Sequence, residues 1–318
     1  MTTLSNDYTR TTMKGIDILL QQHQVPKGPG YAVAVYQRGR VIYCGAAGLA
    51  DIERNVSLTA ASVFDIASVS KQFTAAALVI LEKQGLLSLD DRLADYLDGL
   101  PEYCNSICLR HLLNHTSGLR DYNELLFQAG VQFDQAVSDS QALAMIKRQY
   151  ALEFAPGEKF EYSNTGYFLL ALVVQVVTGK TLSQFSQQAI LTPLEMTSSY
   201  FWGRAGQDQP PVVKAYCDDG NDGYEPQMAN WQTARCAQIR TTCSSGTISS
   251  TRKTHIGGMS PRDCSNRVCS IMERRQSTGW GSSLAAIGAS QSCFTTVAGV
   301  VICRNICAFP SNSCPWLY

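Results

Sequence analysis

The sequence has no excess of charge of either sign and no long hydrophobic run. Its 318 residues carry 26 Lys/Arg and 26 Asp/Glu, so the formal net charge is zero and no overall basic field attracts nucleic acid. The most hydrophobic stretch, residues 167–177, is far shorter than the roughly 20 residues that span a bilayer. The opening residues, MTTLSNDYTRTTMKG, lack the hydrophobic segment of a secretory signal. We therefore predict a cytoplasmic protein that neither binds nucleic acid nor crosses a membrane.

Metal-ligand spacing is also missing, although the chain has 12 cysteines. No C-x-x-C pair occurs, and the closest pairs, Cys104 with Cys108 and Cys303 with Cys307, are four positions apart. Without a secretory signal, a disulfide framework is not expected. The sequence therefore predicts no metal site and no cofactor.

The last 83 residues are short of acids, holding only Asp263 and Glu273 against eight Lys/Arg. Before them the chain has clear local patterns: a β-hairpin over 31–49, a long helix after residue 70, a short helix ending at Gly118 and a buried helix stopped by Gly179. After Cys236 the solvated faces of such elements disappear. We therefore divide the chain into a folded domain, residues 1–235, and an aberrant Ser/Cys/Arg-rich tail, residues 236–318, which we expect to be poorly ordered.

Two interpretations of the tail are open. One is a basic, flexible segment or an unrelated region that binds a partner. The other is translation out of frame: the codons permitted for CSSGTISSTR, read one base earlier, encode LLKWDDFFYE, which has the pattern of an amphipathic helix. The same offset turns FTTVAGVVICRNICAFPSN into a sequence beginning His-Asp-Gly.

A serine and a lysine three residues apart stand where the first long helix is expected to begin. In FDIASVSKQF, Ser68 precedes Lys71, and residues three apart share one helix face. Desolvation favours the neutral lysine amine, which can accept the serine proton. The residues alone leave open that Ser68 caps the helix and Lys71 extends into water. The spacing recurs at Ser250 and Lys253, so it is not specific by itself.

A tyrosine and an asparagine follow a Pro-Gly turn in PGEKFEYSNTGY. Tyr162 and Asn164 can face the same cleft from an extended turn, where the phenol relays a proton and the amide holds a substrate carbonyl. A turn cap with a packed tyrosine is the alternative. The pattern recurs at Tyr103 and Asn105.

Two histidines, His111 and His115, lie four residues apart in LRHLLNHTSGL. The spacing suits a metal pair on a helix, but no glutamate follows His111 as in H-E-x-x-H and no third ligand is evident. We do not predict a metal site from them.

Three stretches in fixed order resemble the serine β-lactamase-related family: residues 30–97, residues 109–122 (LRHLLNHTSGLRDY) and residues 156–180 (PGEKFEYSNTGYFLLALVVQVVTGK). That family groups class C β-lactamases, D-alanyl-D-alanine carboxypeptidases and related esterases and peptidases. The resemblance runs from about Gly30 to Lys180 and weakens towards residue 235. It implies an α/β (α+β) fold with an antiparallel sheet flanked by helices and a helical lobe.

The resemblance also implies a function and four site residues. Ser68 would be the acylated nucleophile, Lys71 its proton partner, Tyr162 the second acid/base and Asn164 a contact to the substrate amide. The implied protein is a serine hydrolase that forms an acyl-enzyme with a small-molecule or peptide substrate containing an amide, ester or β-lactam. In the same family the HLLxHTSGL stretch is a structural helix and turn near the cleft.

The chain departs from the family at a third motif, a His-x-Gly or Lys-Thr-Gly strand at the cleft edge. His255-Ile-Gly257 fits the letters but has no strand pattern around it, whereas the shifted reading yields His-Asp-Gly from the codons of Phe294 to Val297. We therefore expect the C-terminal sheet strands to be missing or disordered and hydrolysis by this chain to be impaired. The alternative is a non-catalytic protein of the same fold or an inactive product. The sequence does not indicate an oligomeric state.

Overall fold

The computed structural model describes residues 14–22, 27–37, 40–131, 137–201, 213–218, 224–227, 239–242, 298–304 and 306–307. The predicted boundary between residues 235 and 236 lies outside these ranges. So do Ser250, Lys253 and His255.

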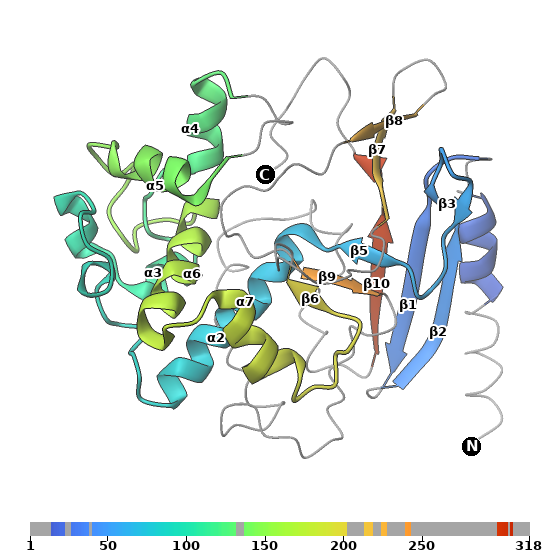
Figure 1. The fold of residues 1–318 in the computed structure, drawn as a ribbon, viewed down its shortest axis with the longest axis horizontal. Coiled ribbons are helices and arrows are strands. Elements are labelled where there is room, and N and C mark those ends of the chain that lie inside the picture. The colour runs from blue at the N-terminus through green and yellow to red at the C-terminus, as the bar shows by residue number, and fades with distance from the viewer. Residues whose placement is uncertain are drawn as a thin grey trace.

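A group of α-helices forms one side of the molecule, on the left of Figure 1. These helices are α2 (Lys71–Lys83), α3 (Leu109–Leu113), α4 (Tyr122–Gln128), α5 (Asp139–Lys147), α6 (Asn164–Thr178) and α7 (Leu182–Ser186). Helices α2 and α6 bury most of their apolar residues in one continuous hydrophobic core shared with the other helices. The predicted long helix after residue 70 is therefore the central helix of this part.

Two glycines show how far the predicted helix ends agree with the structure. Helix α6 ends at Gly179, whose φ of 68° is the left-handed conformation that favours glycine, so that prediction is confirmed. The predicted end of the short helix at Gly118 is wrong, because α3 ends at Leu113 and His115 already has a φ of 55°. Gly118 lies in the following loop, where a Cβ atom would stand 2.1 Å from the Phe154 carbonyl oxygen. Close packing of two loops, not a helix cap, requires glycine there.

No single helix among the described residues is long and apolar enough to cross a membrane. Helix α6 and the following segment Leu182–Leu191 pass that test only as a pair, with a 73° bend between them. Both contribute to the hydrophobic core of the helical part.

The N-terminal hairpin forms a sheet on the other side of the molecule. Strands β1 (Tyr31–Gln37) and β2 (Arg40–Ala47) pair antiparallel, as predicted for residues 31–49. A strand from the tail, β10 (Ala298–Arg304), pairs antiparallel with the other edge of β1, from Tyr31 opposite Arg304 to Gln37 opposite Ala298.

Strand β10 bears on the expectation that the C-terminal sheet strands are missing or disordered, because this one part of the tail is paired with the hairpin. The shortage of acids on which that expectation rested matters for solvated helix faces. A strand pairs through its backbone, and the run Val300–Val301–Ile302 within β10 is rich in the β-branched residues that favour strands. A second strand after residue 236, β9 (Ile239–Thr242), pairs with both β5 (Val63–Asp65) and β6 (Tyr200–Phe201).

The remaining strands complete an architecture of small sheets beside the helices. Strands β7 (Ala215–Asp218) and β8 (Tyr224–Gln227) are antiparallel, β11 (Ile306–Cys307) runs parallel to β7, and β3 (Leu49–Asp51) pairs with β4 (Val56–Ser57). The predicted combination of antiparallel sheet and helical lobe is confirmed.

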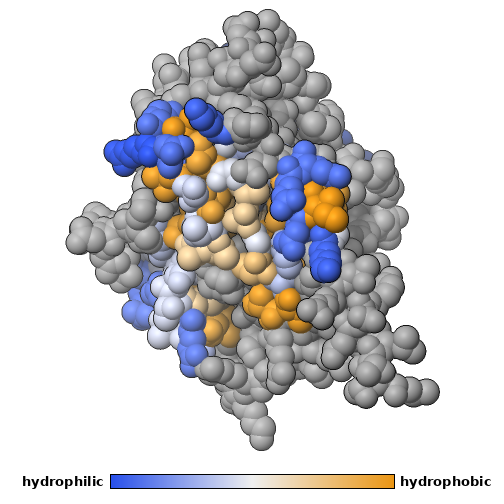
Figure 2. Space-filling view, turned by 90° about the vertical axis from the view of Figure 1, so that its right-hand side faces the viewer, coloured by the Kyte–Doolittle hydropathy of each residue, from blue (hydrophilic) through white to orange (hydrophobic). Residues whose placement is uncertain are grey.

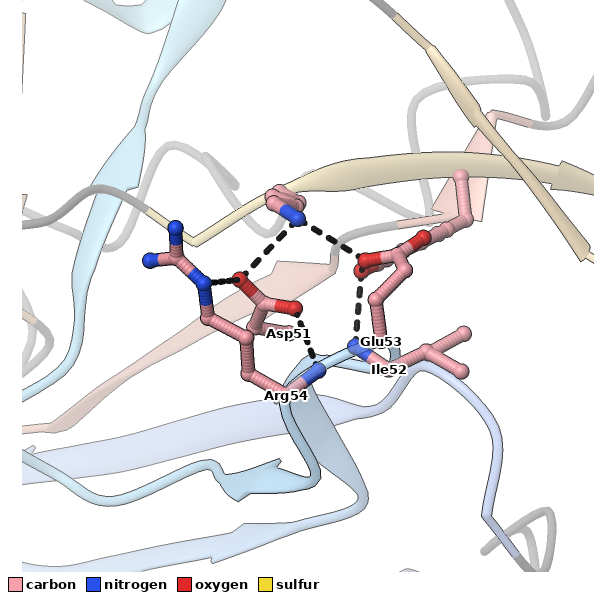
Figure 3. A network of polar contacts seen from close by, with 6 residues as sticks. Asp51, Ile52, Glu53 and Arg54 are labelled. Atoms are coloured by element: carbon pink, nitrogen blue, oxygen red, sulfur yellow. Dashed lines mark hydrogen bonds and ion pairs between the residues drawn. The ribbon is translucent and has the colours of Figure 1, made fainter.

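A polar network ties the turn after β3 to the segment that enters β7, as Figure 3 shows. The Lys214 amine lies 3.0 Å from Asp51 Oδ2 and 2.8 Å from Glu53 Oε2. The Tyr216 hydroxyl donates to the same Glu53 oxygen at 2.8 Å and accepts the Ile52 N–H at 2.7 Å. These contacts join segments about 160 residues apart in the chain and lower the pKa of Glu53 to about 2, chiefly through the hydrogen bond from Lys214.

The hairpin side carries hydrophobic and hydrophilic side chains next to one another in its described part (Figure 2). Ile18 and Leu19, in the helix over residues 14–22, and Val41 on β2 are exposed apolar residues. Among the described residues, the hydrophobic clusters on this side are small, with Ala32, Ala34, Leu58 and Phe64 in one and Leu20, Val33 and Val35 in the other.

Candidate active site

Ser68 lies on a sharp turn between a strand and the central helix. The chain leaves β5, takes a left-handed φ of 44° at Ala67 and enters the short 3₁₀ turn Ala67–Ser70 that leads directly into α2. The Ala67 N–H donates to Asp65 Oδ1 at 2.7 Å, which holds the turn against a backbone conformation that costs a residue with a Cβ about 1–2 kcal/mol. Ser68 is exposed and makes no helix-capping hydrogen bond, so it does not act as a cap.

The four predicted site residues lie together. Ser68 Oγ is 2.6 Å from the Tyr162 hydroxyl and accepts a hydrogen bond from Lys71 Nζ at 3.0 Å. Lys71 Nζ also donates to Asn164 Oδ1 at 2.8 Å, and the Tyr162 hydroxyl lies 3.3 Å from the same amide oxygen. The two sequence patterns, about 94 residues apart, thus form one connected group of polar atoms.

Burial differs sharply within this group. Lys71 is 9% exposed, in the first turn of α2, whereas Tyr162 is 42% exposed and Ser68 also faces outwards. The Lys71 amine lies 4.9 Å from the centroid of the Tyr162 ring and 5.7 Å from that of Tyr167, so two aromatic faces border it. The arrangement offers an accessible hydroxyl with two polar groups, the Lys71 amine and the Tyr162 hydroxyl, within hydrogen-bonding distance.

A buried carboxylate that the sequence analysis missed holds Asn164. Asp121 is 8% exposed, caps α4 by accepting the Asn123 N–H at 2.8 Å, and also accepts the backbone N–H of Asn164, the first residue of α6. Burial raises the pKa of the Asp121 carboxyl, and the hydrogen bonds from Asn164 and Asn123 oppose this effect. The pattern D-Y-N-E at residues 121–124 signals a helix start, but nothing in it points to Asn164.

The other candidates from the sequence have different surroundings. His111 Nδ1 accepts the Cys108 N–H at 3.2 Å, and His115 Nδ1 accepts the Ser163 N–H at 3.0 Å. Within the described part of the chain, no group of three or more His, Cys, Asp or Glu side chains could hold a metal ion. In the repeated pattern, Tyr103 donates its hydroxyl to the Gln149 carbonyl oxygen at 3.2 Å.

Comparison with known proteins identifies the family. The sequence model of the Beta-lactamase family matches residues 18–260, and the chain therefore belongs to this family. A penicillin-binding protein 4* of Bacillus subtilis is 33% identical over 172 residues, which is 54% of this chain and 38% of that protein. A D-aminopeptidase of Brucella anthropi is 37% identical over 174 residues, 54% of this chain and 33% of that enzyme. The matched part thus spans only about a third of the length of these curated relatives.

Solved structures agree with the fold. The octameric penicillin-binding protein homologue from Pyrococcus abyssi is 25% identical with a TM-score of 0.63, over 75% of this chain and 55% of that chain. EstCE1, a hydrolase with promiscuous acyltransferase activity, is 19% identical with a TM-score of 0.73, over 96% of this chain and 95% of its own. At that identity the second likeness supports the fold alone.

Proposed function

We propose that this chain is a serine hydrolase that forms an acyl-enzyme at Ser68 with an amide, ester or β-lactam substrate. The observation that carries the proposal is the position of Ser68 Oγ, 2.6 Å from the Tyr162 hydroxyl and 3.0 Å from Lys71 Nζ. Such distances are those expected of a nucleophile and its proton acceptor. The D-aminopeptidase and penicillin-binding protein among the relatives add support from the names of those proteins.

The acylation step uses these atoms as follows. Lys71 Nζ takes the Ser68 proton as Oγ attacks the substrate carbonyl carbon, and a tetrahedral oxyanion forms. Tyr162 passes a proton to the leaving nitrogen or oxygen as the scissile bond breaks and the acyl-enzyme remains. Water then attacks the ester, with the proton transfers reversed, and the acid product leaves Ser68 free. Asn164 lines the site and orients Lys71 through the 2.8 Å hydrogen bond to Nζ.

Labelling with two reagents tests the proposal. We expect a fluorophosphonate or a fluorescent penicillin to attach covalently to the full chain and not to Ser68→Ala, while circular dichroism shows the same fold for both. A chain that folds but takes up neither reagent would favour the second candidate, a non-catalytic protein of the β-lactamase fold. That candidate draws its support from the absence of a recognisable third motif in the tail sequence.

The tail sequence decides how fast we expect this chain to turn over a substrate, because the family's third motif would lie there. We propose that hydrolysis of a chromogenic β-lactam or ester by this chain is slow, because one oxyanion donor accounts for about 10²–10³ in rate and the third motif is not recognisable in the sequence. Shifting the reading frame by one base before codon 243 should restore turnover. Brisk Ser68-dependent turnover by the chain as it stands would contradict this part of the proposal. The division at residues 235 and 236 and a cytoplasmic location remain predictions, to be checked by limited proteolysis and by cell fractionation.

A further inference from the structure

His115 makes contacts with three consecutive residues around the proposed acid/base. Its carbonyl oxygen accepts the Glu161 N–H at 2.8 Å, and its Nδ1 accepts the Ser163 N–H at 3.0 Å. Between these two hydrogen bonds, its ring stacks on the Tyr162 ring with centroids 4.6 Å apart and planes at 28°. Backbone and ring of one residue therefore fix both the path of the chain and one face of the phenol.

The histidine itself is held firmly. It is 1% exposed, and its ring also stacks on Tyr167 at 5.1 Å and meets the Phe160 ring edge-on at 5.9 Å. The Tyr167 hydroxyl in turn donates to the Leu113 carbonyl oxygen at the end of α3. The ring thus links the end of α3 to the residues that lead into α6.

Tyr162 needs such a support because the residue is partly exposed to solvent. With 42% of the residue exposed, packing does not surround its side chain, yet its hydroxyl must stay within reach of Ser68 Oγ. Misplacing a reacting group by about 1 Å can cost about 10²-fold in rate. A rigid aromatic face against one side of the ring limits that loss.

We infer that His115 is a positioning residue that holds the Tyr162 hydroxyl against Ser68 for proton transfer. The inference rests on the proposed function, since it assigns His115 an effect on acylation that acts through Tyr162. The ring nitrogen that faces the Ser163 N–H accepts a hydrogen bond, so His115 carries out this role with Nδ1 unprotonated.

Two substitutions separate the contacts of His115. His115→Phe keeps an aromatic ring beside Tyr162 but removes the acceptor of the Ser163 N–H. His115→Asn keeps an acceptor at the position of Nδ1 and suits the left-handed φ of 55°, but removes the ring. The matched control is His111→Asn, in which another histidine that accepts a backbone N–H through Nδ1 is replaced.

The experiment measures the rate of fluorophosphonate labelling at Ser68 in the full chain, together with thermal unfolding. We expect each His115 variant to be labelled about tenfold more slowly and His111→Asn to change by less than about twofold. Combined with Tyr162→Phe, which lacks the hydroxyl, the His115 substitutions should slow labelling by no more than about a further twofold. An unchanged labelling rate in both His115 variants, or the same tenfold loss in the Tyr162→Phe background, would overturn the inference. If His115→Phe does not fold, His115→Asn carries the test.

A second readout separates this inference from the proposed function. If the folded wild-type chain is not labelled at all, the proposed function fails, and ¹³C-tyrosine NMR decides whether His115 positions Tyr162. The Tyr162 ring resonance, identified by its absence in Tyr162→Phe, should shift in His115→Asn and stay in place in His111→Asn. A Tyr162 resonance that is indifferent to both substitutions would rule out the positioning role.

Discussion

The helical part and the sheet side of this protein are stabilised in different ways. Among the described residues, one hydrophobic cluster runs through α2 to α7, with Leu78 completely buried at its centre. In the described part of the sheet side there are two small clusters, one of which contains Leu58. There, segments distant in sequence are joined by backbone pairing, as between β1 and β10, and by the ion pairs of Lys214.

This difference explains where the proposed site is built. A packed core fixes side chains in single rotamers, whereas strand pairing fixes mainly the backbone. Lys71 and Asn164 are the first residues of α2 and α6, and Ser68 and Tyr162 lie just before these two helices. All four residues precede residue 165, and the strand that leads into Ser68, β5, pairs with β9 of the tail.

Removing the proposed base should produce the largest effect. Lys71→Ala deletes the buried amine beside Ser68 Oγ, and we expect fluorophosphonate labelling to slow by about 10²–10⁴, the range typical of a lost general base. Lys253→Ala, in the repeated S-x-x-K pattern of the tail, is the control and should be labelled at the wild-type rate. If Lys71→Ala and Lys253→Ala slowed labelling equally, the proposed base would not be specific to the site around Ser68.

Matched leucine substitutions measure the two cores directly. Leu78→Ala and Leu58→Ala remove the same atoms from sites that are 0% and 6% exposed. Leu→Ala changes in cores cost about 2–5 kcal/mol, depending on how far the site collapses. We expect Leu78→Ala near the upper end and Leu58→Ala near the lower end, from urea unfolding monitored by circular dichroism. If Leu58→Ala lowered the free energy of unfolding more than Leu78→Ala, the sheet side rather than the helical part would have the more tightly packed core.

Replacing Asp121, the buried carboxylate that holds Asn164, should slow labelling at Ser68 even where the chain remains folded. Each oxygen of the Asp121 carboxylate accepts one backbone N–H, from Asn164 and from Asn123. In Asp121→Asn an NH₂ group, which cannot accept, replaces one of these oxygens, so one of the two hydrogen bonds is lost. We expect labelling at Ser68 to slow by about tenfold to a hundredfold. Exposed Asp98→Asn serves as the control, and wild-type labelling by Asp121→Asn would show that Asn164 is positioned by other contacts.

The smallest effect concerns pH and the network on the sheet side. The folded pKa of Glu53 is about 2 and the ordinary value is 4.5, so between these values the unfolded chain binds a proton that the folded chain does not. Stability from this contact is therefore complete above pH 4.5 and is lost as the pH falls towards 2. The difference in urea midpoint between wild type and Glu53→Gln should shrink over that window, and the exposed control Glu102→Gln should show no such trend. If the difference in urea midpoint stayed constant with pH, the ion pair between Glu53 and Lys214 would not contribute to stability.

The sequence predicted the elements whose signals are local. The hairpin over 31–49 and the stop of α6 at Gly179 follow from alternation and from a glycine C-cap, and both are present. The grouping of Ser68 and Lys71 with Tyr162 came from the order of several motifs, since helical spacing relates only residues within one helix.

What escaped the sequence depends on contacts between distant segments. Helix α3 ends at Leu113, and two residues later the His115 ring stacks on Tyr162, a contact across 47 residues that no local rule contains. The composition of the tail gave no sign of the place of β10, because its pairing with β1 draws on backbone groups that composition does not describe. Asp121 signals a helix start, and only the fold brings it to Asn164.

The central claim is that this chain, with its tail as it stands, places an acylatable serine at position 68. The most direct measurement is peptide mapping by mass spectrometry of the folded, full-length chain after treatment with a fluorophosphonate. We predict one adduct, on the peptide that contains Ser68, even where turnover of a chromogenic β-lactam is slow. An unmodified Ser68 in a folded chain, or an adduct on Ser250 instead, would contradict the account.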